Sequence, residues 1–101
     1  MNTRRGALPL ALLLGACAAP GGERAFLGAW SCTGGSFDLR FTNLRATVNG
    51  AVTPIDQVGS YGPNYTLDLR DGSRISLFDV TEDTLTYHRP ATGETRDCIR
   101  S

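Results

Sequence analysis

The single histidine, His88, is the first residue to test for chemistry, because imidazole is the commonest general base in enzymes. A nucleophilic set would need this histidine beside a serine and a carboxylate. Residues 58–62, with the sequence Val-Gly-Ser-Tyr-Gly, come near the Gly-x-Ser-x-Gly nucleophile elbow, but valine replaces the first glycine and no helical pattern follows. We therefore predict no catalytic residues and interpret His88 as a solvent-facing residue of a strand.

Acidic side chains offer a second kind of chemistry, since Asp79 is followed closely by Glu82 and Asp83. A glycosidase needs two carboxylates that face a cleft at a set separation, and we interpret these three as residues that solvate a turn. The chain also contains no Gly-x-x-x-x-Gly-Lys loop, no Cys-x-x-Cys pair and no Gly-x-Gly-x-x-Gly fingerprint. The sequence thus predicts no enzyme, no cofactor and no metal site.

The elements that must position these residues show a period of two, which is typical of strands with one buried face. Phe37, Leu39 and Phe41 alternate with polar residues, and similar alternation occurs at residues 65–70 and 84–88. None of these segments places its apolar residues at helical spacing. We expect strands near residues 28–33, 36–42, 44–48, 51–58, 64–70, 73–80, 84–88 and 94–99.

Turn signals separate the expected strands at short spacing. Gly34-Gly35, Asn49-Gly50 and Asp71-Gly72 are candidates for two-residue hairpin turns, because glycine and asparagine tolerate a positive φ. The predicted fold is therefore all-β: a small antiparallel meander that closes into a roughly eight-stranded barrel or a sandwich. Closure would also remove the exposed edges that invite aggregation.

One stretch breaks the alternation. Ile75 and Leu77 share a face of their strand, whereas Phe78 and Val80 lie on the other face. A β-bulge near Leu77 would restore a single apolar face, and coverage of both faces is the alternative.

The chain begins with a targeting segment. Arg4 and Arg5 precede an apolar run of eight residues at 7–14, which suits the central part of a signal peptide. A membrane-spanning helix would need about 20 such residues. The run leads into the sequence Leu-Gly-Ala-Cys at 14–17, which resembles the bacterial lipobox.

This resemblance implies that residues 1–16 are a signal peptide and that Cys17 is the lipidated first residue of the mature protein. Its thiol would receive a diacylglyceryl group and its amine an acyl chain. An ordinary secretory leader, cut after Ala16 or Ala19, is the alternative. By the same resemblance, Ala18 behind the cysteine favours the outer membrane, with the protein facing the periplasm. Residues 17–25, rich in small residues, read as a lipidated flexible tether, and residues 26–101 as a small β domain.

An odd number of cysteines in an exported protein requires an explanation, and lipidation of Cys17 supplies it. Cys32 and Cys98 remain, in the first and last expected strands, and the envelope outside the inner membrane is oxidising. We predict that they form one disulfide, which matters in a domain too small for a large core. A metal-binding thiol pair is the alternative, which the absence of a spaced histidine disfavours.

Residues 59–65 have the composition of a binding loop between strands. Tyrosine brings contact area at low entropic cost, while glycine and proline shape a projecting loop. The alternative is a plain connection with Tyr65 packed in the core. The candidate binding residues are Ser60, Tyr61, Gly62, Asn64 and Tyr65.

The layout of lipobox, tether, first-strand Cys32, Gly-x-x-Tyr at 62–65 and last-strand Cys98 resembles the membrane-bound inhibitors of c-type lysozyme. The resemblance implies a small β-barrel whose loop enters the lysozyme cleft. In that family a serine just before the glycine and a later lysine engage the catalytic carboxylates. Here Tyr61 stands before Gly62, with Ser60 one position further back, and only an arginine such as Arg74 could supply the charge.

The expected function is that of a non-catalytic binding module on the cell envelope, with the membrane and an envelope or host protein as partners. The alternative is a structural or assembly accessory lipoprotein. All ten basic residues are arginine, and loss of Arg4 and Arg5 with the leader leaves eight against ten acidic residues. Nucleic-acid binding is not expected, since it would need a clustered positive face.

We expect mass spectrometry of the membrane fraction to find Cys17 at the N-terminus with its acyl chains. Replacement Cys17→Ser should move the protein out of the membrane fraction, because lipidation requires the thiol. A mature protein that begins with unmodified Cys17 would contradict the lipobox interpretation.

Overall fold

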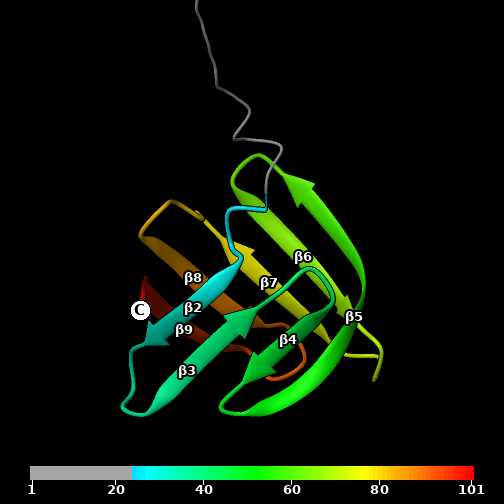
Figure 1. Ribbon diagram of the computed structural model, residues 1–101, viewed down its shortest axis with the longest axis horizontal. Helices are drawn as coiled ribbons and strands as arrows, with labels where there is room; N and C mark the ends of the chain where they lie inside the picture. Colours follow the sequence, from blue (N-terminus) through cyan, green and yellow to red (C-terminus); the bar gives the residue numbers. More distant parts are fainter. Residues whose placement is uncertain (1–23) are drawn as a thin grey trace, which may run out of the picture.

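The computed structural model describes residues 24–101, which form a closed barrel of antiparallel strands in sequence order (Figure 1). The predicted signal peptide, Cys17 and the tether up to residue 23 lie outside the described residues. The all-β meander predicted from the alternation is confirmed, and it closes as a barrel. No helix long and apolar enough to cross a membrane occurs in the described part. The strands are β2 (Gly28–Cys32), β3 (Phe37–Phe41), β4 (Arg45–Val48), β5 (Ala51–Tyr61), β6 (Asn64–Leu69), β7 (Arg74–Phe78), β8 (Thr84–Arg89) and β9 (Glu94–Arg100).

Each strand pairs with the next one along the chain, so successive turns alternate between the two ends of the barrel (Figure 1). One end, called here the N-terminal rim, carries the segment 24–27, the connections 42–44, 62–63 and 79–83, and Ser101. The other end, called the opposite rim, carries the remaining four connections. These are residues 33–36, 49–50, 70–73 and 90–93.

The Asn49-Gly50 turn between β4 and β5 shows how local sequence specifies a hairpin. Its two residues have φ values of 52° and 85°, the combination that matches the twist of the flanking strands. The Asn49 side-chain oxygen also accepts a hydrogen bond of 2.9 Å from the Asp38 N–H on β3. The hairpin predicted from this dipeptide is confirmed.

The barrel interior is filled by the inward residues of the alternating strands. Trp30 is fully buried, and its indole N–H donates a 2.8 Å hydrogen bond to the Phe26 carbonyl. Phe26 itself closes the N-terminal rim from inside, with its ring 5.6 Å from that of Phe41 and 4.9 Å from that of Tyr65. Residues 26–101 thus contain a complete core, so this part of the chain can fold on its own.

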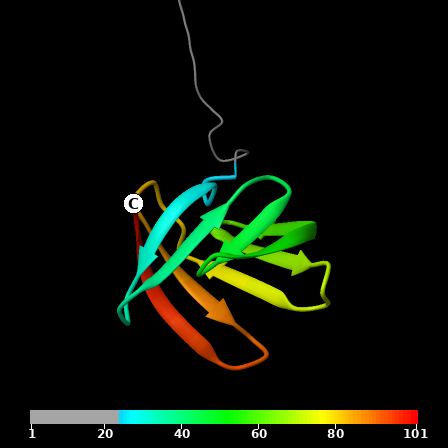
Figure 2. The ribbon, with the colours of Figure 1, turned by 60° about the horizontal axis from the view of Figure 1, so that its bottom comes forward.

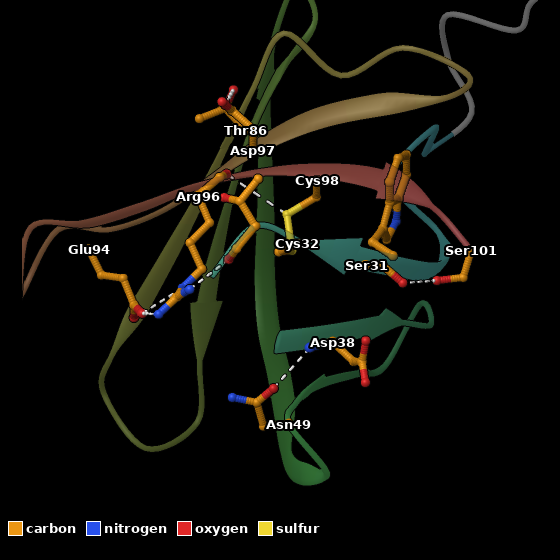
Figure 3. Close-up of a disulfide and its surroundings, with 12 residues drawn as sticks. Ser31, Cys32, Asp38, Asn49, Thr86, Glu94, Arg96, Asp97, Cys98 and Ser101 are labelled. Atoms are coloured by element: carbon orange, nitrogen blue, oxygen red, sulfur yellow. Dashed lines mark hydrogen bonds and ion pairs between the residues drawn. A yellow bond between two sulfur atoms is a disulfide. The ribbon is translucent and has the colours of Figure 1, made fainter. Parts of the chain in front are cut away.

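The barrel closes where β2 meets β9 (Figure 2), and the predicted disulfide lies in this seam (Figure 3). Cys32 and Cys98 are directly opposite each other, and the bond between them is confirmed. Arg96 and Arg100 lie on the same face of β9 as Cys98. Their guanidinium groups stack on inward aromatic rings, at 4.0 Å from Phe37 and 4.2 Å from Trp30.

The change of face after Leu77 is present, but β7 has no β-bulge there. β7 pairs with both neighbours in unbroken register, and the shift falls in β5 between Ile55 and Gln57. β7 instead ends at Phe78, and Asp79 adopts a φ of 53° that returns Val80 to the core. The bulge prediction was therefore wrong, because a left-handed residue after the strand end produces the same change of face.

Replacement Cys32→Ala should lower the free energy of unfolding by on the order of 4 kcal/mol, because the bond closes a separation of 66 residues in the unfolded chain. Guanidinium unfolding of residues 24–101 measures the loss. Reduction of the unmodified domain should give a loss of the same size, while Ser31→Ala in the same strand should have little effect. Equal stability of Cys32→Ala and the parent would contradict the proposed role of the bond.

Candidate functional site

The hairpin of β5 and β6 extends past its neighbour on one side. β5 has eleven residues, but β4 pairs only with its first four, at residues 51–54. The last contact on that side is the Ile55 N–H, which donates to the Leu44 carbonyl at 2.8 Å. No described strand lies beside residues 56–61 on that side, so this stretch forms an open edge in the barrel wall (Figure 1).

The register indicates which backbone groups face the open edge. Tyr61 and Asn64 flank the two-residue turn at 62–63, and such flanking residues exchange hydrogen bonds with each other. Because antiparallel pairs alternate, Gly59 also bonds toward β6. The N–H and C=O groups of Val58 and Ser60 therefore point away from β6, toward the open edge.

The tip of the hairpin is braced against the segment that follows β7. The Asn64 side-chain oxygen accepts a 3.0 Å hydrogen bond from the Asp79 N–H. The Pro63 carbonyl accepts a 2.9 Å hydrogen bond from the Val80 N–H. Tyr61 stands out from this fixed tip, with 84% of its surface exposed.

The predicted binding loop at 59–65 is a strand hairpin, so the expectation of a loop needs correction. β5 runs through Tyr61 and β6 begins at Asn64, which leaves only Gly62 and Pro63 as the turn. Tyr65 is 8% exposed and packs against Phe26, as the alternative interpretation expected. Its ring is inward because it alternates with Asn64 and Thr66 on β6.

Of the five candidate binding residues, Ser60, Tyr61 and Gly62 are exposed, and they remain available for a partner. Asn64 is half-buried, and its side-chain oxygen accepts the hydrogen bond from the Asp79 N–H. We call Ser60, Tyr61 and Gly62 the hairpin tip.

A pocket of about 480 Å³ lies behind the hairpin tip at the N-terminal rim. Gly62, Pro63 and Tyr65 line one side, and Val80 and Arg100 line another. It is a shallow hollow of the rim beside the fixed hairpin.

Arg100 holds the N-terminal segment onto this rim. Its guanidinium donates to the carbonyls of Glu82 at 2.6 Å, Leu27 at 2.8 Å and Ala25 at 2.9 Å. Gly28, at a φ of 113°, leaves room for it, because a side chain there would begin 2.7 Å from the Arg100 Nη1. Arg100 was not among the residues singled out from the sequence. Its spacing of two from Cys98 was the signal that it faces inward.

Arg74, named from the sequence as one arginine that could supply a charge to the binding residues, does not lie beside them. Arg74 begins β7 next to the opposite rim, and it forms an ion pair of 2.7 Å with Asp68. The exposed charges close to the tip are acidic instead, at Asp79, Glu82 and Asp83. The sequence did not place Arg74 relative to the tip, because the strand direction that puts Arg74 at one rim and Gly62 at the other depends on the pairing of the whole meander.

His88 and Ser60, the two residues that a nucleophilic site would need, lie far apart in the barrel. His88 lies on β8, where its Nδ1 is 2.9 Å from the Thr95 hydroxyl and its ring is 6.0 Å from that of Phe78. Ser60 lies on β5, three strands away in the barrel order. Within residues 24–101, no three histidine, cysteine, aspartate or glutamate side chains gather in a way that could hold a metal ion.

Within the described part of the chain, the Asp71 carboxyl has a shifted pKa, and it stabilises a turn at the opposite rim. Hydrogen bonds from the hydroxyl and the N–H of Ser73 hold the pKa of Asp71 below its ordinary value, since they favour the ionised form. These bonds fix the connection between β6 and β7, where Gly72 has a φ of 91°.

Comparison of the chain with protein-family models, curated protein sequences and solved structures finds no match in any of the three.

Replacement Arg100→Leu should lower the free energy of unfolding by on the order of 2 kcal/mol, because it leaves three carbonyl groups at the rim without their donor. Amide hydrogen exchange of Leu27 should accelerate at the same time. Arg40→Leu, on the outer face of β3, is the matched control and should leave both readouts near their parental values. Unchanged exchange in Arg100→Leu would show that other contacts hold the segment.

Proposed function

We propose that the chain is a lipid-anchored, non-catalytic binding module of the bacterial cell envelope, and that it binds through the hairpin tip. The observation that carries this proposal is the exposed Tyr61 on a hairpin whose turn is hydrogen-bonded to the segment after β7. The anchor rests on the lipobox resemblance of residues 14–17. Nothing in the proposal requires a reaction.

Rigidity supports a binding role for the tip. A partner that meets a preformed surface loses less conformational entropy on binding. Here Tyr65 anchors β6 in the core, and Asn64 fixes the turn to Asp79. Tyr61 can then act as an anchor residue, with its ring for apolar contact and its hydroxyl for a hydrogen bond.

The alternative, an assembly accessory of the envelope, is favoured by the short distance between the predicted anchor and the barrel. Only six residues separate Cys17 from Arg24, a reach of about 25 Å when fully extended. The N-terminal rim would therefore stay near the membrane, where membrane-bound partners are more accessible than incoming proteins.

Photo-crosslinking can test the proposed surface in the full-length protein. A photoreactive residue in place of Tyr61 should form adducts in intact envelopes, with protein or with lipid. The same residue in place of Val52, which is exposed on β5 near the opposite rim, is the matched control and should form few. Equal yields at the two positions would contradict a binding role for the hairpin tip.

Inhibition of c-type lysozyme is a narrower form of the proposal, supported by the resemblance at Cys32, residues 62–65 and Cys98. The hydroxyls of Ser60 and Tyr61 would have to contact the cleft without help from Arg100, which is bound to backbone carbonyls. The acidic residues beside the tip disfavour a cleft that carries two carboxylates.

Residues 24–101 can be assayed against c-type lysozyme on cell-wall substrate. We expect any inhibition to be lost in Tyr61→Ala and retained in Arg74→Ala, because Arg74 lies next to the opposite rim. Inhibition that depends on Arg74 would contradict the assignment of the tip. Absence of inhibition at micromolar protein would exclude lysozyme and leave the envelope partner.

A further inference from the structure

Exposed apolar side chains are concentrated near the N-terminal rim. Leu44 and Tyr61, which are 66% and 84% exposed, lie at the β3–β4 and β5–β6 connections of this rim. Phe78 and Ile99 are also exposed and lie at or next to the last residues of strands that end there. Of the large apolar side chains exposed in residues 24–101, only Val52 lies near the opposite rim.

The opposite rim is polar by comparison. Its connections are built from glycine, serine, threonine, asparagine, aspartate, arginine, proline and one alanine, with no large apolar residue. These connections are residues 33–36, 49–50, 70–73 and 90–93. The asymmetry between the rims indicates that the two ends of the barrel face different surroundings.

We propose that the N-terminal rim rests on the membrane that holds the anchor, with Tyr61 and Leu44 in the interfacial layer of a zwitterionic bilayer. This inference rests on the proposed function, because it identifies the lipid surface as the partner of the hairpin tip. The short link from Cys17 to Arg24 brings this rim, and not the opposite one, within reach of the bilayer.

The chemistry of the two side chains suits this location. Tyrosine concentrates at membrane interfaces because its ring is apolar while its hydroxyl keeps a polar partner. Insertion of leucine into the interface is favourable, because it removes apolar surface from water. The pair belongs to neighbouring hairpins, since Leu44 is held by the Ile55 N–H on the strand that ends in Tyr61.

The open edge of β5 limits how deeply the hairpin tip can enter the bilayer. The N–H and C=O groups that Val58 and Ser60 direct toward it need hydrogen-bond partners, which water and lipid headgroups provide and the hydrocarbon core does not. The tip therefore lies among the headgroups. Its turn suits this position, because Pro63 has no N–H to desolvate.

The charges of the rim favour a zwitterionic surface over an anionic one. Asp79, Glu82 and Asp83 are exposed on the β7–β8 side. Of the arginines near this rim, Arg24 donates to Asn43 and Arg100 is held by carbonyls, which leaves Arg45 to attract lipid phosphates. The barrel should tilt so that the β3–β4 and β5–β6 connections touch the bilayer while the acidic side stays in water.

Lipid-borne quenchers can test the orientation. The full-length lipoprotein in phosphatidylcholine vesicles would carry a fluorophore at Tyr61→Cys or, as the matched control, at Val52→Cys. We expect quenching by spin-labelled lipid to be several times stronger at position 61 than at 52. Equal quenching at the two positions, in protein shown to be acylated, would overturn the inference and leave the anchor intact.

Attachment of the protein to vesicles by a tether other than Cys17 tests the orientation of the N-terminal rim independently of the lipid anchor. Residues 18–101 with an N-terminal histidine tag can be held on vesicles that contain nickel-chelating lipid. Stronger quenching at position 61 than at position 52 on these vesicles would support the orientation of the rim. If Cys17 is also found unmodified in the natural protein, the anchor is rejected while the orientation stands. Equal quenching there would overturn the inference whatever the state of Cys17.

Partitioning of the barrel domain between water and vesicles provides a second measurement. The double replacement Leu44→Ser and Tyr61→Ser should lower the binding of residues 24–101 to phosphatidylcholine vesicles by about tenfold, since each side chain loses apolar surface. Val52→Ser should leave binding unchanged. Anionic lipid should not strengthen binding of the parent domain, and a steep increase with anionic lipid would contradict the zwitterionic assignment.

Discussion

The pairing of β2 with β9 is the constraint on which the rest of the structure depends. Closure brings the first and last strands together, and Cys32 opposite Cys98 makes that seam covalent. The inward face of β9 then carries a basic residue on either side of the disulfide. Arg96 covers the Phe37 ring near one rim, and Arg100 covers the Trp30 ring near the other. Both keep their charged groups hydrogen-bonded to carbonyls, so the ends of a small core are closed without burying an unpaired cation.

Closure of the seam also decides which features share a rim. Because the barrel has an even number of strands in simple up-and-down order, the chain enters and leaves at the same end. Arg100 fixes the incoming segment there through Leu27 and Ala25, and Phe26 packs against Tyr65 next to the turn of the hairpin. Residues 24–27, where the described chain begins, and the hairpin tip therefore lie at the same end of the barrel. A lipid anchor on the chain that precedes residue 24 would therefore hold the hairpin tip near the membrane.

The hairpin combines a fixed turn with an edge that no strand pairs with in the described chain. Its turn is bonded to the segment after β7, whereas residues 56–61 have no strand on their other side within the described chain. Natural sheets usually protect such edges with charges, proline or a cover. The Asp56 carboxylate, 2.9 Å from the Arg70 Nε, is the one charge on this stretch, and the edge beyond it is neutral. Contact with the headgroup layer would satisfy its backbone groups and cover Tyr61.

The sequence by itself determined the fold class, the approximate strands and the disulfide, because alternation, turn dipeptides such as Asn49-Gly50 and the placement of Cys32 and Cys98 are local or end-to-end signals. Only the tertiary structure decided the site. The two-residue turn at 62–63 sets which groups at the end of β5 bond to β6, whereas the shift between Ile55 and Gln57 results from strand pairing that no local pattern encodes. Tyr65 is part of the core because it packs against Phe26. Arg74 lies away from the tip because of the direction of its strand. Arg100 holds the N-terminal segment because closure of the barrel brings β9 beside β2. Each of these outcomes depends on contacts between residues far apart in the chain.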